Sequence, residues 1–189
     1  MLHAAREEFR RRLVHVTPEA LAAPTPCAEW TVRDLVNHVI GGERLTAALL
    51  GGATTEAAVE ALNADWLAEA RTTEDLLTAF TAATEALDQA ALVPGALDRV
   101  VDHLVGQVPG RQAIGFRVPE YLVHAWDLAR ALDVDDTLDP VLVARTWEDM
   151  RDMAPVIGTS GYFGTGPSGT LDEDSPLQAR LLDLSGRRP

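Results

Sequence analysis

Three polar side chains share one face of an otherwise apolar segment near the middle of the chain. Glu120, His124 and Asp127 are spaced by four and three residues, which places them on one stripe of a helix. The surrounding sequence, YLVHAWDLARAL at 121–132, is apolar around most of a helical circumference, and this predicts a buried helix. Burial of a carboxylate and an imidazole is costly unless partners satisfy both groups.

A divalent metal is one partner that satisfies Glu120 and His124, because ligands one helical turn apart reach the same cation. The alternative is a hydrogen-bonded pair within the helix, with Asp127 bridged to Arg130 on the solvent side. This helix alone leaves both interpretations open.

A second predicted helix offers a third ligand. Thr31 and Asp34 form a capping-box start for a helix over Val32–Leu50. His38 lies on the core stripe of that helix, where Leu or Ile is usual. One such histidine is more often hydrogen-bonded than ligating, but two helices that both aim an imidazole inward are typical of metal sites in helical bundles. Two His, one Glu and an open position form the pattern of a catalytic zinc site.

Two carboxylates are candidates to orient the ligating histidines through their second ring nitrogens. Asp34 lies one turn from His38, and Asp127 lies one turn from His124. Each has a simpler role as well, Asp34 as the helix cap and Asp127 as the partner of Arg130.

The remaining reactive side chains give weaker signals. Cys27 lies in a proline-flanked loop without an evident base, so a packing role fits it as well as a redox or nucleophilic one. His103 precedes the buried helix and is close enough in sequence to approach the site. Arg111 and Arg117 flank that helix and suit a substrate carboxylate, although exposed charges are the simpler expectation. Asn37 and Glu43 are expected to face solvent.

The composition excludes several partners. The net charge is −13 and the chain contains no lysine, which argues against binding to nucleic acid or to an anionic membrane. Cys27 is the single cysteine, so no internal disulfide forms and a reducing cytoplasm is the expected location. The charged N-terminus predicts no signal peptide, and no stretch approaches the ~18 apolar residues of a membrane span.

The pattern predicts an all-α fold. Further helices are expected over 2–16, 55–70, 72–87, 139–153 and 176–184, whereas 92–110 is compatible with a short strand or a helical turn. The helix that carries Glu120 begins at Pro119 or, as a kinked helix, near Gln112. We expect a metal-binding four-helix bundle over 1–157, with 158–189 as an irregular tail and short closing helix of the same domain.

Two segments together resemble a known superfamily. TPCAEWTVRDLVNHVIGG at 25–42 and EYLVHAWDLARAL at 120–132 are similar to DinB-like and mycothiol-dependent maleylpyruvate isomerase N-terminal domains. The closing LLDLSGRRP resembles the ending of a single-domain actinobacterial subfamily. The resemblance implies a DinB-like four-helix bundle that holds a divalent metal, usually zinc. The implied ligands are His38, Glu120 and His124, the same residues that burial and spacing indicate.

The resemblance also implies that the open metal position takes mycothiol, or another low-molecular-weight thiol, as a thiolate. The leading hypothesis is therefore a mycothiol-dependent transferase or isomerase acting on an electrophilic small molecule, such as an activated alkene or an epoxide. The maleylpyruvate isomerases carry a second, C-terminal domain that this chain is too short to include. We therefore expect thiol chemistry rather than that particular isomerisation.

Two other functions are compatible with the sequence. One is a metal-dependent hydrolase, for which Asp127 or His103 is the available general base. The other is a non-enzymatic metal-binding sensor or partner protein. A homodimer is compatible with all three functions.

Overall fold

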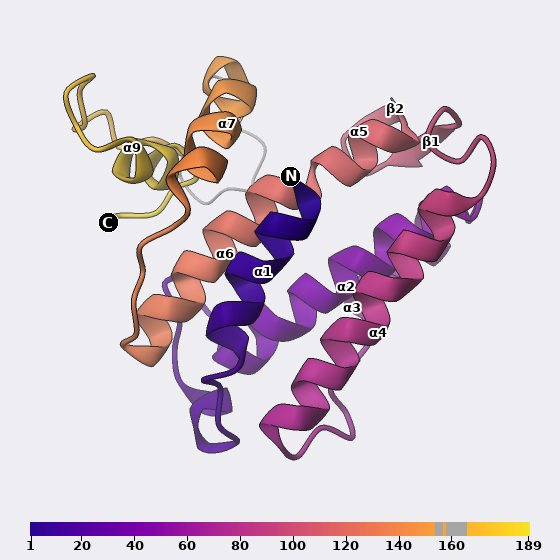
Figure 1. The fold of residues 1–189 in the computed structure, drawn as a ribbon, viewed down its shortest axis with the longest axis horizontal. Helices are drawn as coiled ribbons and strands as arrows, with labels where there is room; N and C mark the ends of the chain where they lie inside the picture. Colours follow the sequence, from indigo (N-terminus) through magenta and orange to yellow (C-terminus); the bar gives the residue numbers. More distant parts are fainter. Residues whose placement is uncertain (154–156, 158–165) are drawn as a thin grey trace.

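The computed structural model describes residues 1–153, 157 and 166–189, and this part of the chain is mostly helical (Figure 1). In chain order its elements are α1 (Leu2–Leu13), η1 (Glu19–Ala22), α2 (Val32–Leu50), α3 (Thr55–Asn63), α4 (Thr73–Leu92), β1 (Val100–His103), β2 (Gly106–Pro109), α5 (Gly110–Gly115), α6 (Arg117–Leu132), α7 (Pro140–Met150), η2 (Arg151–Met153) and α9 (Leu177–Leu184). The prediction of a mostly helical chain is confirmed.

The main core lies between the long helices. Helix α1 packs against α6 and α4, and α2 packs against α4 and α6. Three aromatic rings from different helices meet there, with centroids 5.7 Å apart for Phe9 and Phe80, 5.9 Å for Phe9 and Tyr121, and 6.1 Å for Phe80 and Tyr121. Tilted and edge-on aromatic pairs of this kind add stabilisation beyond the burial of apolar area. The core therefore fixes α1 and α4 against α6, which carries two of the candidate ligands.

Helix α2 begins and packs as its sequence indicates. The Thr31 side chain accepts a hydrogen bond from the Asp34 backbone, and the Asp34 carboxylate accepts one from the Thr31 backbone, which completes the capping box. Helix α3 covers another side of α2. A Cβ atom at Gly41 would lie 2.2 Å from the Leu62 carbonyl oxygen, so this close approach of α2 and α3 requires glycine.

The segment 92–110, which the sequence left open, contains a hairpin. Strands β1 and β2 pair antiparallel, with Val101 opposite Val108. The short helix α5 follows, and α6 begins at Arg117 after a break at Phe116, which is closer to the kinked helix expected from near Gln112 than to a start at Pro119. Pro119 is tolerated in the first turn of α6, because backbone N–H groups there have no partner within the helix. The prediction of a helix over 55–70 is wrong at its end, since α3 stops at Asn63.

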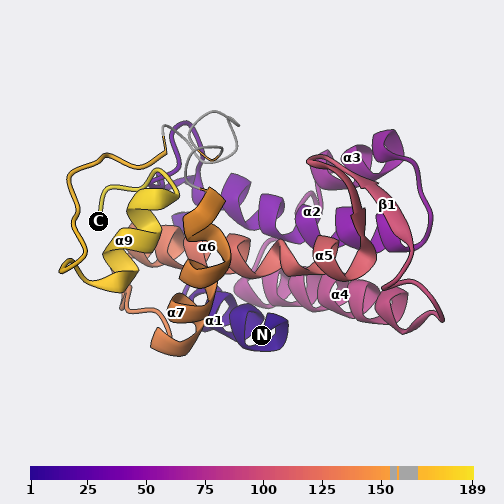
Figure 2. The same ribbon diagram turned by 90° about the horizontal axis from the view of Figure 1, so that it is seen from above.

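The C-terminal elements lie beside α6. Helices α7 and α9 pack on each other, and Figure 2 shows α9 next to one end of α6. The predicted irregular segment at 158–174 lies partly outside the described residues, and 166–174 contains no helix or strand. The division into 1–157 and 158–189 remains a prediction. Within the described residues, no helix combines the length and apolarity that crossing a membrane requires.

Candidate metal centre

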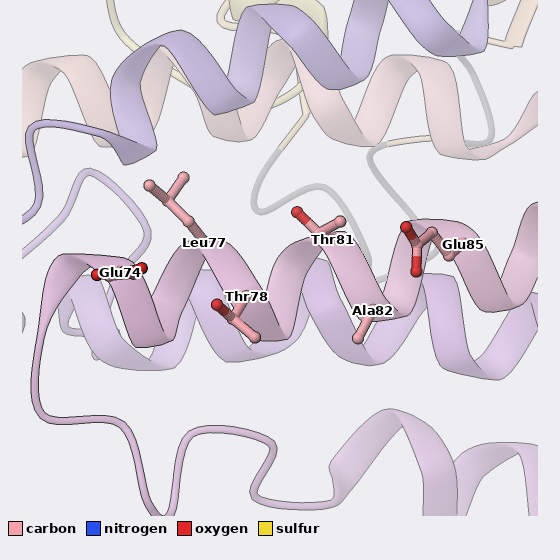
Figure 3. A pocket seen from close by; sticks show the side chains of 6 residues that line it. All are labelled: Glu74, Leu77, Thr78, Thr81, Ala82 and Glu85. Atoms are coloured by element: carbon pink, nitrogen blue, oxygen red, sulfur yellow. The ribbon is translucent and has the colours of Figure 1, made fainter.

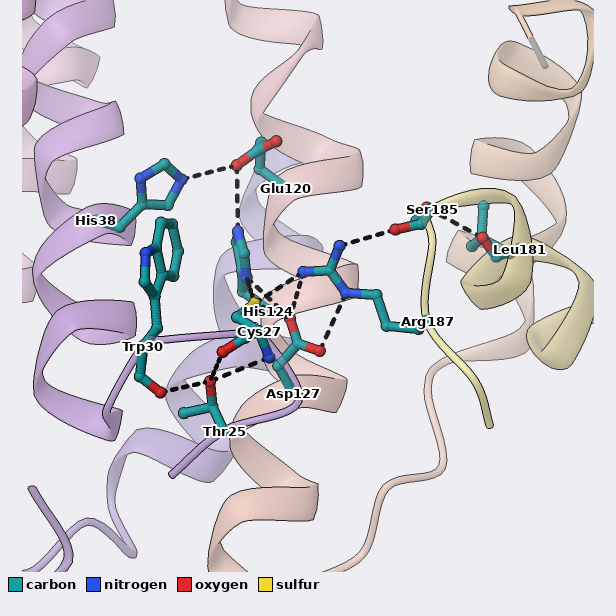
Figure 4. Close-up of polar contacts among 10 residues, drawn as sticks. All are labelled: Thr25, Cys27, Trp30, His38, Glu120, His124, Asp127, Leu181, Ser185 and Arg187. Atoms are coloured by element: carbon teal, nitrogen blue, oxygen red, sulfur yellow. Dashed lines mark hydrogen bonds and ion pairs between the residues drawn. The ribbon is translucent and has the colours of Figure 1, made fainter. Parts of the chain in front are cut away.

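Helices α2 and α6 bring His38, Glu120 and His124 together (Figure 4). One carboxylate oxygen, Glu120 Oε2, lies 3.2 Å from His38 Nε2 and 3.4 Å from His124 Nε2. The three ligand atoms all lie within 4.8 Å of one another. His124 is nearly buried, whereas the side chains of His38 and Glu120 are 28% and 24% exposed, so the cluster is open on one side.

These separations fit a zinc-binding set. Nitrogen and oxygen ligands about 2.0–2.1 Å from a tetrahedral zinc ion lie roughly 3.3–3.4 Å from one another. The two distances from Glu120 Oε2 are close to that value. Two imidazoles and one carboxylate also match the composition of a zinc site with a free fourth position. The residues present therefore fit a divalent metal.

The same contacts set the protonation states of the three side chains. Burial raises the pKa of Glu120, but hydrogen bonds from His124 and His38 outweigh it and hold the pKa of this carboxyl well below its usual range. Burial lowers the pKa of His38, and the bond with Glu120 only partly compensates. Burial also opposes the charged form of His124, yet its bond with Asp127 raises the pKa of this imidazole well above the ordinary value.

Trp30 forms an apolar wall over the two imidazoles. Its ring centroid lies 4.7 Å from that of His38 and 5.9 Å from that of His124. The loop holds it there through Thr25, whose backbone N–H and side-chain hydroxyl donate to the Trp30 carbonyl oxygen at 3.1 and 3.0 Å. The preceding Glu29 has a φ of 68°, an uncommon backbone conformation for a residue other than glycine.

The two candidate supporting carboxylates lie in different surroundings. Asp127 is fully buried, and its Oδ2 lies 3.0 Å from His124 Nδ1, the arrangement that orients a ligating histidine. The alternative pairing with Arg130 is wrong, because Arg130 pairs with Asp136 at 3.3 Å. The Asp34 carboxylate instead accepts hydrogen bonds from the backbone and hydroxyl of Thr31, as a helix cap.

Sequence reasoning missed Arg187 and the position of Cys27. The Cys27 thiol lies 3.2 Å from Asp127 Oδ2 and 3.9 Å from His124 Nδ1, so acidic and basic groups do surround it. Arg187 Nη2 lies 3.0 Å from the Cys27 sulfur and 2.7 Å from Asp127 Oδ2. The one sequence signal for this contact was the resemblance of the closing LLDLSGRRP, which contains Arg187.

Cys27, His124 and Asp127 also lie close enough together to hold a metal ion. The guanidinium of Arg187 already binds two members of this second group, however, and its fixed positive charge opposes a cation at the same place. The group of His38, Glu120 and His124 is therefore the better candidate metal centre.

Several side chains expected at the surface are buried. Glu43 is fully buried between Arg6 and Arg117, and Arg117 also donates to the Val39 carbonyl oxygen at 3.1 Å. Asn37 is half-buried and binds the backbone at Ala64 and Trp66.

Arg111 is exposed as expected, paired with Asp98. His103 lies in β1 with its ring against Phe116, at a centroid distance of 5.1 Å.

Two surface depressions differ in their relation to the centre. One, of about 380 Å³, opens beside the candidate ligand His38 and is lined by Glu29, Trp30, Asp34, Asn37, His38, Leu62 and Asn63. The other, of about 290 Å³, is lined by residues of the single helix α4 (Figure 3). Only the first contains a candidate ligand, so it is the candidate binding site for a small molecule.

Comparisons with known proteins place the chain in a family. Two relatives are the uncharacterized proteins MT0763 and Rv0738 of Mycobacterium tuberculosis, from strains CDC 1551 and H37Rv. Each is 34% identical over 138 residues, which are 73% of this chain and 69% of the relative. No solved structure matches the chain significantly. The model of the family described as mycothiol maleylpyruvate isomerase N-terminal domain matches residues 2–129, so the chain belongs to that family.

Proposed function

We propose that this protein is a metal-dependent enzyme that uses a small thiol, with mycothiol as the cosubstrate and transfer or isomerisation as the reaction. The observation that supports it best is the convergence of His38, Glu120 and His124 at separations that suit zinc. Membership of a mycothiol-related family supports the thiol. In the same proposal, α1, α2, α4 and α6 form the DinB-like four-helix bundle.

The ligand set suits a thiolate electrostatically. Two neutral imidazoles and one carboxylate contribute a single negative charge, so a divalent centre keeps a net positive charge. When bound, such a metal lowers the pKa of a coordinated thiol, and a thiol with a free pKa of ~8.5 is then present as the thiolate at neutral pH.

The other residues of the site hold and shield these ligands. Asp127 accepts a hydrogen bond from Nδ1 of His124, so Nε2 is the atom that would bind the metal once its proton is displaced. Trp30 covers the imidazoles of His38 and His124 on one side and limits the access of water. The depression beside His38 gives a small thiol a route to the open side of the cluster. The second substrate in this proposal is an electrophile that reaches the thiolate from the same depression.

The hydrolytic alternative has less support. A hydrolase needs a free general base beside the metal. Asp127 is fully buried, and both of its carboxylate oxygens already accept hydrogen bonds from Arg187. His103 lies on β1 against Phe116 rather than within the ligand cluster. The hydrolase therefore remains a hypothesis without a specific observation in its favour.

Isothermal titration calorimetry tests the proposal. Mycothiol should bind the zinc-loaded protein and not the metal-free protein. Binding should release a proton, because the coordinated species is the thiolate, so the measured enthalpy should differ between two buffers of different ionisation enthalpy. X-ray absorption at the zinc edge should show a sulfur ligand only after the thiol is added.

The Cys27→Ala variant is the matched control, because Cys27 carries the one thiol of the chain and lies close to His124. The added thiol should still give a sulfur ligand in this variant. A sulfur ligand present without added thiol, and lost in Cys27→Ala, would place the metal at the second group instead. Absence of thiol binding to the zinc-loaded protein would favour the hydrolase or the non-enzymatic function.

A further inference from the structure

Arg187 joins three parts of the chain at the back of the candidate metal centre. It follows α9, and its guanidinium reaches Asp127 on α6 and Cys27 in the loop before α2 (Figure 4). The side chain is only 10% exposed. Its Nη1 group donates to the Ser185 carbonyl oxygen at 2.8 Å, which fixes the guanidinium relative to its own backbone. The contacts with Asp127 and Cys27 and the contact with Ser185 together hold the guanidinium in a single orientation.

The contact with Asp127 is bidentate. Nε donates to Oδ1 at 3.1 Å, and Nη2 donates to Oδ2 at 2.7 Å. Two parallel bonds of this kind fix the plane of a carboxylate as well as its position. The same Oδ2 atom lies 3.0 Å from His124 Nδ1. The plane of the Asp127 carboxylate in turn orients the imidazole of His124.

We infer that Arg187 is a positioning residue of the metal centre, which acts through Asp127 to fix the ring of His124 for metal binding. The inference rests on the proposed metal-binding function. It adds that the family-matched residues 2–129 do not build the centre alone, because Arg187 lies beyond them. The C-terminal segment is thus a part of the site.

The alternative role for Arg187 is purely structural, as a neutralising partner of a buried carboxylate. A lysine would supply the same charge, but its ammonium is a point donor and cannot fix the carboxylate plane through parallel bonds. Comparison of Arg187→Lys with Arg187→Ala therefore separates orientation from charge.

The test measures zinc affinity by competition with a chromophoric chelator, together with the visible absorption of the cobalt-substituted protein. Arg187→Ala should weaken zinc binding about 10–100-fold, the usual effect of removing an outer support of a metal ligand. Its cobalt spectrum should change in intensity, because the geometry of His124 changes. Arg187→Lys should restore only part of the affinity.

Arg180→Ala is the matched control. Arg180 lies on α9 and stacks over Trp147 of α7 at 4.6 Å, so its loss loosens the C-terminal segment without touching the centre. Its zinc affinity should equal that of the wild type. In an Asp127→Asn background, Arg187→Ala should add less than about a threefold further loss, because both changes act through one carboxylate.

An Arg187→Ala variant that binds zinc as the wild type does would overturn the inference. An equal loss of zinc affinity in Arg180→Ala would also overturn it, because it would show that packing of the C-terminal segment, rather than the contact of Arg187 with Asp127, supports zinc binding. Should Arg187→Ala fail to fold in circular dichroism, the folded Arg187→Lys variant decides, and wild-type affinity with an unchanged cobalt spectrum would refute orientation. Failure of the wild type itself to bind zinc is a separate result, which refutes the proposed function.

Discussion

Two carboxylates lie where α2 meets α6, Glu43 fully buried and Glu120 partly exposed, and their partners give them different roles. Glu43 Oε2 lies 2.5 Å from Arg6 Nη2, and Glu43 Oε1 lies 3.4 Å from Arg117 Nε. Glu120 instead has two imidazoles as partners. A guanidinium stays protonated and has no lone pair to offer a metal, whereas a neutral imidazole has one.

The difference shows that a buried charge is not by itself a sign of function. The Glu43 carboxylate lies between two guanidiniums, and their fixed positive charges oppose a cation at the same place. The cluster at Glu120 offers three ligand atoms and is open to a depression beside His38. The chemistry of the partners, rather than the depth of burial, marks the second cluster as the candidate site.

Removal of the Glu43 charge should have the largest effect on stability. Glu43→Gln leaves Arg117 buried without a carboxylate partner, and disruption of such a buried pair costs about 3–5 kcal/mol of unfolding free energy. Chemical denaturation of the metal-free protein measures this change. Asp88→Asn is the control, because Asp88 is the exposed partner of Arg6 and its loss should cost at most ~1 kcal/mol. Zinc affinity of the folded Glu43→Gln protein should be unchanged, and a loss there would mean that the two clusters are coupled.

Removal of a candidate ligand should instead weaken zinc binding and leave the stability of the metal-free protein almost unchanged. His38→Ala leaves two ligands on one helix, so zinc affinity should fall more than roughly 100-fold, or about 2.7 kcal/mol. Stability of the metal-free protein should change little, since the His38 side chain is partly exposed. Elemental analysis and zinc titration check this, with His103→Ala as a control that keeps full metal content. Equal zinc in His38→Ala and the wild type would refute the ligand assignment.

The sequence predicted the parts of the site that depend on local periodicity. The capping box at Thr31 and Asp34 fixed the start of α2, and therefore the face that presents His38. Spacing along α6 similarly placed Glu120 and His124 on one stripe. Helical phase alone was sufficient to nominate these three side chains, because each helix is regular through its ligand positions.

The sequence could not predict contacts that depend on how many neighbours a helix has. Glu43 was expected at the surface, but α2 packs against α3, α4 and α6 and is buried on more than one face. Arg117 was also expected to be exposed, but it lies at the start of α6 and its guanidinium is buried against Glu43 and Val39 of α2. Arg187 is 60 residues from Asp127 and 160 from Cys27, so no local pattern connects them.

A smaller effect should come from the glycine that makes room for Arg117. A Cβ atom at Gly42 would lie 2.2 Å from Arg117 Nη1, and this guanidinium is held by Glu43 and the Val39 carbonyl oxygen. Gly42→Ala should therefore lower stability by about 1–3 kcal/mol, the range for overpacking. At Gly115 a Cβ atom meets nothing within 4 Å.

Gly115→Ala is therefore the matched control for Gly42→Ala, and should be neutral or stabilising by up to ~1 kcal/mol, because alanine favours the helix. Thermal and denaturant unfolding compare the two variants. Equal stability of both would show that Arg117 moves aside freely, and that the cluster at Glu43 is less rigid than its hydrogen bonds indicate.

The smallest effect should come from Asp34, a third carboxylate on the same pair of helices, which is exposed. Asp34→Asn should leave zinc affinity unchanged, because this carboxylate binds Thr31 rather than His38. Stability at pH 7 should fall by about 0.5–1 kcal/mol through the weaker cap.

The hydroxyl and backbone N–H of Thr31 lower the pKa of Asp34 in the folded protein. The contribution of the ionised group is therefore fully present above the unfolded pKa of ~3.9, and is lost as the pH falls through the lower folded value. The stability difference between wild type and Asp34→Asn should accordingly be constant from pH 7 to pH 5 and shrink below about pH 4, as denaturation series at each pH will show. A drop in zinc affinity in this variant would instead assign Asp34 to the support of His38.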